Sequence, residues 1–207
     1  TLQTPGVAPG AQAGGLAAPE VRPLSPMRKT IARRLTESKQ TVPHFYLTID
    51  VDAGPLVELR ERINGELAAS AKGEEKPLKV SLNDLLIKAC ATALRRVPEC
   101  NAQFTAEAIL VHNRVDISVA VAVPDGLVTP VVRNADNKSV VRIAEEVRDL
   151  AARARAKKLR PEEMADGTFS ISNLGMFGID AFSAVINPPE GAILAVGQAR
   201  EEVVVKD

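Results

Sequence analysis

The segment at residues 82–97 constrains the fold most, because apolar residues recur around much of its circumference at helical spacing. Ser81 can cap this helix, Asp84 occupies its third position, and Pro98 lies just past its end. A helix that is apolar on most sides has to be buried, so we expect the rest of the chain to pack around it. Cys90 is then expected to be a small core residue and not a nucleophile.

Short runs of strand-forming residues alternate irregularly with other helical segments. Further helices are predicted over residues 26–39, around 56–67 and over 139–157. Strands are predicted at 45–52, 104–111, 115–123, 127–132, 168–173, 181–186, 192–197 and 203–205, with a turn at 124–126 and a charged loop at 72–79. This irregular order favours an α/β sandwich with a mixed sheet over a doubly wound fold.

Composition excludes several classes of function. Hydrophobic residues make up 45% of the chain and charged residues 25%, which excludes wholesale disorder. The 26 basic and 26 acidic side chains cancel, and Trp is absent, so nucleic acid and anionic membranes are poor candidates for partners. Cys90 and Cys100 are too few for a disulfide framework or a four-thiolate zinc site, and no metal is expected. No apolar run approaches the ~20 residues of a membrane span, and no secretory signal is visible.

The first 23 residues differ in composition from the rest. Residues 1–23 consist mainly of Ala, Pro, Gly, Gln and Thr, which predicts an extended, flexible linker. Such linkers usually tether another domain, and we expect one upstream of Thr1. Residues 24–207 are then expected to form the folded domain.

The standard catalytic signatures are absent: there is no phosphate-binding loop, no Gly-x-Ser-x-Gly elbow and no His-Glu-x-x-His helix. The two histidines are His44 and His112. His112 and Asp116 have a spacing that could orient an imidazole, but Ile117 follows where a tight active-site turn would want glycine. We therefore favour structural roles for both histidines.

A hydroxyl-rich strand at residues 168–173 runs into a loop bounded by Gly175 and Gly178. This arrangement can aim a hydroxyl into a cleft, and Ser172 is the candidate. The alternative is a strand serine that bonds only to the backbone. Residues 187–191 predict a rigid turn before the strand at 192–197.

Several segments, taken in order, resemble one known family. The chain is similar over about residues 22–207 to the catalytic domain of dihydrolipoamide acyltransferases, the E2 components of 2-oxo acid dehydrogenase complexes. The matching segments are residues 26–35, 38–40, 42–45, 81–89, 97–101, 115–122, 126–131, 167–178 and 186–189. The run at 172–179, Ser-Asn-Leu-Gly-Met-Phe-Gly-Ile, looks like the acetyl-transferring, pyruvate dehydrogenase branch.

The resemblance implies a chloramphenicol-acetyltransferase-like α/β sandwich whose trimers assemble into a core of 24 or 60 subunits. It also implies that an acyl group passes from the thiol of a lipoyl group, carried on a separate lipoyl domain, to coenzyme A. Active sites would lie between neighbouring chains, and the E1 and E3 components would bind through domains outside these residues. The expected compartment is the bacterial cytoplasm or, as the second choice, the mitochondrial matrix.

The resemblance assigns roles to four residues of this chain. Ser172 aligns with the family's oxyanion-stabilising serine, and Thr129, Asn173 and Met176 are expected to line the substrate channel. The family's His-Arg-Val-x-Asp-Gly motif does not occur in these 207 residues. We therefore expect a catalytic domain that is incomplete at its C-terminus and, by itself, inactive. The alternatives are a catalytically inactive core scaffold and an intact small binding module.

Overall fold

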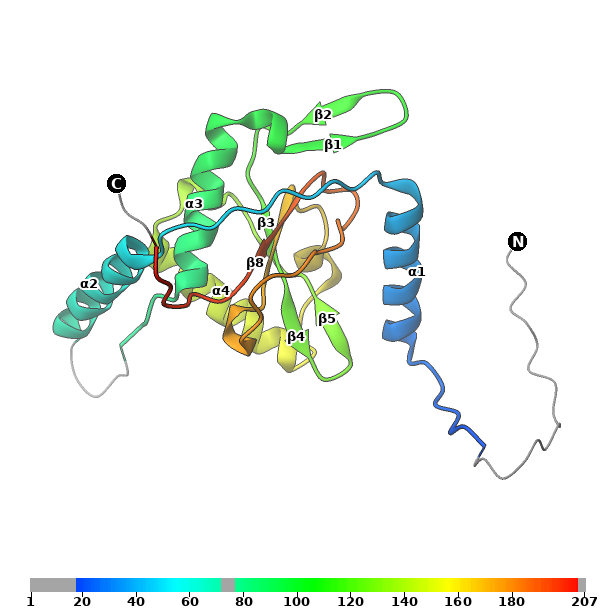
Figure 1. The fold of residues 1–207 in the computed structure, drawn as a ribbon, viewed down its shortest axis with the longest axis horizontal. Coiled ribbons are helices and arrows are strands. Elements are labelled where there is room, and N and C mark those ends of the chain that lie inside the picture. Colours follow the sequence, from blue (N-terminus) through cyan, green and yellow to red (C-terminus); the bar gives the residue numbers. More distant parts are fainter. Residues whose placement is uncertain (1–17, 72–76, 205–207) are drawn as a thin grey trace.

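The computed structural model describes residues 18–71 and 77–204. Its helices are α1 (Pro26–Thr41), α2 (Gly54–Ser70), α3 (Leu82–Arg96) and α4 (Val140–Arg155), with short 3-10 turns at Pro98–Cys100, Ala135–Asn137, Pro161–Met164 and Gly175–Phe177. The strands are β1 (Ala102–Phe104), β2 (Ile109–Val111), β3 (Ile117–Val119), β4 (Val121–Val123), β5 (Gly126–Val128), β6 (Val131–Val132), β7 (Phe169–Asn173) and β8 (Ile193–Val196). Figure 1 shows the sheet at the centre, with α1 and α2 on opposite sides of the molecule.

A four-stranded mixed sheet organises the fold, as predicted. Its strand order is β6-β3-β7-β8. β3 runs antiparallel to β6 and parallel to β7, which in turn runs parallel to β8. Two separate hairpins, β1-β2 and β4-β5, project from this sheet. The second hairpin turns at Pro124 and Asp125, which confirms the turn predicted there.

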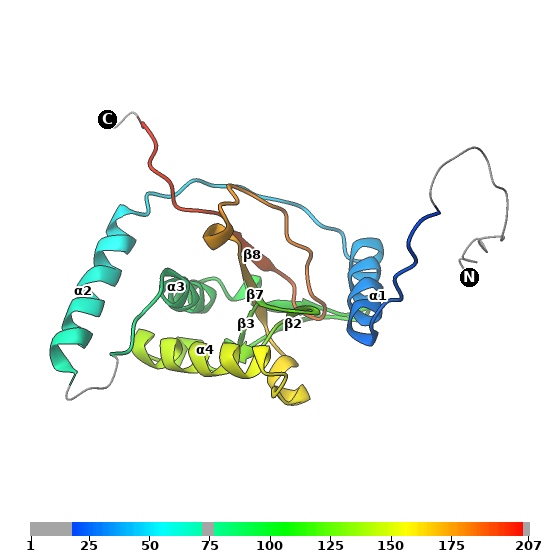
Figure 2. The same ribbon diagram turned by 90° about the horizontal axis from the view of Figure 1, so that it is seen from below.

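Helices α3 and α4 cover one face of the sheet, and Figure 2 shows both on the same side of β3 and β7. The main core lies between these two helices and the sheet. Its buried side chains are Ile87, Ala91, Leu94, Val115, Ile117, Val119, Val132, Ala135, Ile143, Leu150 and Ile171. Helix α2 contributes to a second, smaller cluster built around Val80, Leu85 and Ala144. Burial of this apolar area stabilises the sandwich.

The start of α3 has the predicted cap. The Asp84 main-chain amide donates to Ser81 Oγ at 3.2 Å, and the Ser81 amide donates to the Asp84 carboxylate at 2.7 Å. The helix is less buried than expected, because Ala89 and Ala93 lie on an exposed side. Cys90 packs against the main core, and burial raises the pKa of its thiol to about 11. A thiol in that state is a core residue, as predicted.

The prediction of a strand at residues 45–52 is wrong. This segment is extended but pairs with no strand of the described chain. Phe45, Leu47, Ile49 and Val51 are 81%, 88%, 83% and 74% exposed. The alternating pattern predicts a strand, but a strand also needs a neighbour whose backbone accepts its hydrogen bonds. We call residues 45–51 the apolar arm.

Other predicted strands are interrupted or absent. The run at 104–111 is a hairpin, because Thr105 and Ala108 bond to each other and reverse the chain. The run at 115–123 breaks at Ala120, where β3 leaves the sheet for β4. The run at 127–132 likewise divides into β5 and β6. Residues 181–186 and 203–204 form no strand, and β8 is only half-buried.

The remaining predictions fall partly or wholly outside the described residues. They are residues 1–17 of the expected linker, residues 72–76 of the expected charged loop and Val205 of the last expected strand. Residues 18–23, the described part of the expected linker, are exposed and have no regular secondary structure.

Candidate active site

The face of the sheet that points away from α3 and α4 is polar. Successive side chains of a strand point to opposite faces, so residues two apart share a face. Ile117, Val119 and Ile171 point into the helix-covered core. The residues between them make up what we call the polar face: Asp116 and Ser118 on the β3 side, and Thr168, Ser170 and Ser172 on the β7 side. Four of these five side chains, all but Ser172, are buried.

Ser172 lies near the carboxyl end of β7. Its main chain pairs with Ala195 of β8, and the ladder to β3 ends one residue earlier, where the Ala120 amide donates to the Ile171 carbonyl at 2.9 Å. Its side chain is half-buried and makes no hydrogen bond to any other described residue. The Ser172 hydroxyl is thus free to donate to a ligand on the polar face.

Ser170, two residues before Ser172, differs from it in burial and in hydrogen bonding. It is 2% exposed and its hydroxyl donates to one carboxylate oxygen of Glu190, while the hydroxyl of Ser118 donates to the other. The pKa of the Glu190 carboxyl is raised, because the effect of burial is larger than the opposing effect of the two hydroxyl bonds. A Cβ on Gly167 would overlap both the Ser118 hydroxyl and the Glu190 carboxylate, so only glycine fits beside them.

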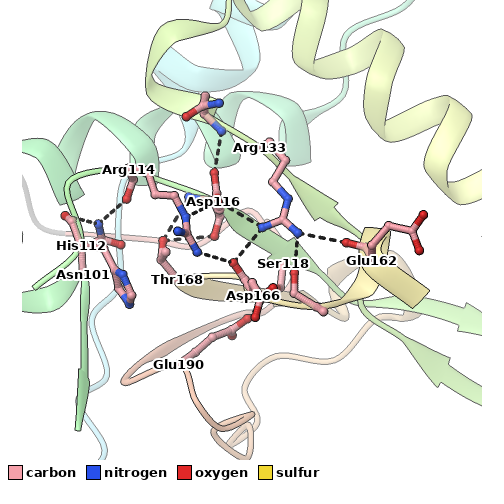
Figure 3. A network of polar contacts seen from close by, with 12 residues as sticks. Asn101, His112, Arg114, Asp116, Ser118, Arg133, Glu162, Asp166, Thr168 and Glu190 are labelled. Carbon is pink, nitrogen blue, oxygen red and sulfur yellow. Dashed lines mark hydrogen bonds and ion pairs between the residues drawn. The ribbon is translucent and has the colours of Figure 1, made fainter. Parts of the chain in front are cut away.

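Asp116, at the amino end of the same face, is held by main-chain and arginine donors (Figure 3). Its carboxylate accepts from Arg114 Nε at 2.7 Å, from Arg133 Nη1 at 3.1 Å and from the Asn134 amide at 2.7 Å. Arg133 also donates to the carbonyls of Glu162, Ala165 and Asp166 at 3.0, 2.5 and 2.8 Å. This network fastens the loop after α4 to the edge of the sheet.

The geometry agrees with a structural role for His112. The Asp116 carboxylate bonds to arginines and to a main-chain amide, not to an imidazole. Burial, followed by the nearby Arg114 charge, lowers the pKa of His112. His112 precedes the amino end of β3, whereas Ser172 lies beyond the last pair of the β3–β7 ladder, Val119 and Ile171. The two residues are therefore at opposite ends of that ladder.

His44 is also engaged through both ring nitrogens. Its Nε2 accepts from the Ile186 amide at 3.1 Å, so its Nδ1 carries the hydrogen and donates to the Val42 carbonyl at 2.7 Å. The Ile186 carbonyl accepts from the hydroxyl of Ser38, at the end of α1, at 2.6 Å. His44 thus joins α1 and the apolar arm to the loop before β8. Neither ring nitrogen is left to act as a base.

The other three expected site residues are placed differently from one another. Thr129 is half-buried and precedes Pro130, whose carbonyl accepts from the Val119 amide at 2.9 Å, so Thr129 lies at the same end of the sheet as Ser172. Asn173 bonds to Asn83 of α3 at 3.3 Å and therefore faces the helices, away from the polar face.

Met176 follows in the turn after β7 and is 81% exposed. A channel lined by Thr129, Asn173 and Met176 stays a prediction.

Sequence reasoning missed Glu190 and Gly167. A charged residue two positions before a predicted buried strand, as Glu190 is, could have been recognised as a candidate for burial. Its partners could not, because they lie 72 and 20 positions away in the chain.

Within residues 18–71 and 77–204, no group of three or more His, Cys, Asp or Glu side chains could hold a metal ion. No helix in this part of the chain is long and apolar enough to span a membrane.

Comparisons with known proteins agree with this architecture. The family model described as 2-oxoacid dehydrogenases acyltransferase (catalytic domain) matches residues 17–207. The dihydrolipoyllysine-residue acetyltransferase component of the pyruvate dehydrogenase complex of Rickettsia bellii is 49% identical over 91% of this chain. The mitochondrial counterpart of Caenorhabditis elegans is 50% identical over 88% of this chain. The chain spans 45% and 36% of those two relatives.

Solved structures show the same fold. A probable dihydrolipoamide acetyltransferase from Listeria monocytogenes has a TM-score of 0.85 and 34% identity, covering 93% of this chain and 80% of that one. The cubic core of a pyruvate dehydrogenase multienzyme complex has a TM-score of 0.86 and 32% identity, covering 96% and 80%. These matches confirm the predicted α/β sandwich, and the chain belongs to the family of 2-oxoacid dehydrogenase acyltransferases, in the part that forms their catalytic domain.

Proposed function

We propose that the chain transfers an acetyl group from the thiol of a lipoyl group, carried on a lipoyl domain, to coenzyme A. The observation that carries this proposal is Ser172, whose hydroxyl is unengaged among the described residues while Ser118 and Ser170 beside it are bonded to Glu190. The relatives support the acetyl group, because they are named as acetyltransferase components of pyruvate dehydrogenase complexes.

The chemistry requires a base and an oxyanion donor. A thiol has a pKa of about 8.5, so little of it is thiolate at neutral pH. A base takes the proton of the coenzyme A thiol, and the thiolate attacks the acetyl-lipoyl carbonyl. The Ser172 hydroxyl donates to the oxyanion that forms. As the intermediate collapses, the bond to the lipoyl sulfur breaks, and that sulfur receives the proton from the base.

The base is proposed to be a histidine outside residues 1–207. Both histidines of the chain are unsuited, because His44 has both nitrogens engaged and His112 lies at the far end of the β3–β7 ladder from Ser172. A related enzyme supports the division of labour: the structural and enzymatic study of Azotobacter vinelandii dihydrolipoamide acetyltransferase addresses a serine, a histidine and an asparagine in its catalytic mechanism.

Copies of the chain are proposed to form trimers that assemble into a core of 24 or 60 subunits. The apolar arm supports this proposal, because its four large apolar side chains are at least 74% exposed in one subunit. Phe104 and Ile109 of the β1-β2 hairpin are also exposed, at 81% and 69%. The lipoyl domain and the E1 and E3 components are proposed partners, reached through other segments. The compartment is proposed to be the bacterial cytoplasm or the mitochondrial matrix, in line with the named relatives.

A second candidate function is a core subunit that organises the complex without catalysing. Two observations favour it: both ring nitrogens of His44 are engaged, and His112 lies at the far end of the β3–β7 ladder from Ser172. Acetyl transfer by the full-length protein separates the two candidates, because a scaffold would leave the rate at background.

The test of the enzyme proposal is Ser172→Ala in the full-length protein, assayed with acetyl-dihydrolipoamide and coenzyme A. Loss of one oxyanion donor is expected to lower kcat by ~10²–10³-fold. KM for coenzyme A should stay nearly unchanged, because the bond strengthens only in the transition state.

Ser170→Ala is the matched control, since Ser170 lies on the same strand and the same face. We expect it to cost less than about fivefold in kcat, far below the loss of an oxyanion donor. A Ser172→Ala enzyme within about threefold of the wild type, or a Ser170→Ala enzyme equally impaired, would show that Ser172 is not the oxyanion donor.

A further inference from the structure

Glu190 is the one carboxyl group buried against the hydroxyls of the polar face in the described chain. It is 5% exposed and reaches the sheet from the loop that leads into β8. Ser118 and Ser170, which it binds, are directly paired residues on the neighbouring parallel strands β3 and β7. One side chain therefore joins three separate segments of the chain at a single point.

Stability alone does not account for a carboxyl group at this position. Removing a carboxyl from water is costly, and two hydroxyl donors offset that cost only in part, as the raised pKa of Glu190 indicates. Two serines paired across strands could bond to main-chain or water partners at lower cost. The carboxyl also packs directly against Gly167, where any side chain would overlap it.

The position of Ser172 indicates a role for the Glu190 carboxyl. Ser170 and Ser172 are two residues apart on one strand, so their side chains stand ~7 Å apart on the same face. A free hydroxyl at Ser170 could rotate toward the same ligand or hold a competing water. The bond to Glu190 prevents this.

We propose that Glu190 is a positioning residue for Ser172. It holds the other two serine hydroxyls of the polar face, so that Ser172 alone is presented to the acyl carbonyl. This inference rests on the proposed function, and it adds a residue that touches neither substrate. The role needs an acceptor of this size and shape, which glutamine also supplies.

The experiment measures kcat and KM for acetyl transfer in full-length Glu190→Ala, Glu190→Gln, Ser172→Ala and the Glu190→Ala/Ser172→Ala double variant. Glu190→Ala should lower kcat by about 10- to 100-fold, the range for a catalytic group misplaced by about an ångström. KM for coenzyme A should stay within about twofold, because ground-state binding is unaffected. Glu190→Gln should recover kcat to within about threefold of the wild type, since glutamine preserves the side-chain shape.

The double variant distinguishes positioning from general weakening. If Glu190 acts through Ser172, the Glu190→Ala change should cost less than about threefold once Ser172 is alanine. Ile143→Ala is the control for lost stability, since Ile143 is fully buried in the helix-covered core. Ile143→Ala should lower the melting temperature. At temperatures where this variant is still folded, its kcat should equal that of the wild type. Should Glu190→Ala fail to fold, Glu190→Met fills similar space without accepting a hydrogen bond, and it replaces Glu190→Ala in the same cycle.

Each outcome decides a separate question. Equal losses from Glu190→Ala in both backgrounds, or no rescue by glutamine, overturn the positioning role and leave the function standing. A Ser172→Ala enzyme as active as the wild type overturns the oxyanion assignment and the positioning role together. No acetyl transfer by the wild type overturns the proposed function and, with it, this inference.

Discussion

The two faces of the central sheet are built on opposite principles, although the same strands supply both. On the helix-covered face, Ile117 and Ile171 are at most 1% exposed and pack against α3 and α4. On the polar face, their direct neighbours Ser118 and Ser170 are just as buried but bond to Glu190. Packing stabilises one face and hydrogen bonds organise the other. A single step along β7 therefore separates residues that stabilise the fold from residues that we assign to chemistry.

The largest expected effect on stability comes from the helix-covered face. Ile171→Ala should lower the free energy of unfolding by about 2–5 kcal/mol, because it leaves a cavity between the sheet and the helices. Ser172→Ala, one residue away, should cost less than about 0.5 kcal/mol, because its half-buried hydroxyl bonds to no other described residue. Urea unfolding of both variants measures the contrast. Equal losses would show that the two faces do not differ as described.

A smaller effect is expected at the amino end of the polar face. Asp116→Ala removes a carboxylate that is 3% exposed and accepts from two arginines and the Asn134 amide. We expect a loss of about 1.5–3 kcal/mol, the usual range for hydrogen bonds to a charged group. The side chains of Arg114 and Arg133 are 48% and 34% exposed, so water can solvate them after the change.

Asp116→Asn keeps an acceptor and should lose less stability in the same urea titration. If Asp116→Ala instead unfolds the protein as readily as Ile171→Ala does, hydrogen bonding at this face contributes as much as packing does at the other.

The smallest effect is a pH dependence that arises from Glu190. Burial raises the pKa of Glu190 in the folded chain above its ordinary value of 4.5, so the folded state favours the protonated form. The stability that follows is complete below that ordinary value and is lost as the pH rises through the raised pKa. Each unit of pKa difference corresponds to about 1.4 kcal/mol.

Glutamine cannot ionise, so the melting temperature of Glu190→Gln relative to the wild type should increase with pH over this window. Thermal unfolding from pH 4 to pH 8 measures it. A constant or narrowing difference between the two proteins would contradict the assigned direction.

Much of the helix-covered face could be predicted from local sequence signals. The Ser81 and Asp84 cap and the apolar spacing of Ile143, Val147 and Leu150 define α3 and α4 without reference to the rest of the chain. The alternation of Thr168, Ser170 and Ser172 also indicates a strand with one polar side. These patterns have a range of a few residues, and short-range backbone geometry is enough to interpret them.

The features that the sequence does not predict depend on contacts between residues that are far apart in the chain. The apolar arm has the pattern of a strand, but whether it becomes one depends on a partner backbone that its own residues cannot specify. Glu190 meets its partners only where β3 and β7 come together. The strand pattern makes Ser172 a candidate, whereas its role as oxyanion donor is what the family resemblance implies. Hydrophobic periodicity predicts where a segment is buried, but not which distant side chain will meet it.

The junction at Ile186 has a consequence for mutational tolerance. The bonds to His44 and Ser38 both use the main chain of Ile186, its amide and its carbonyl, and not its side chain. Almost any residue at this position can supply the same two groups, so the attachment of α1 is insensitive to the identity of residue 186. Proline is the exception, because it lacks the amide hydrogen. Residues of most chemical types should therefore be tolerated at position 186, and proline should be the one exception.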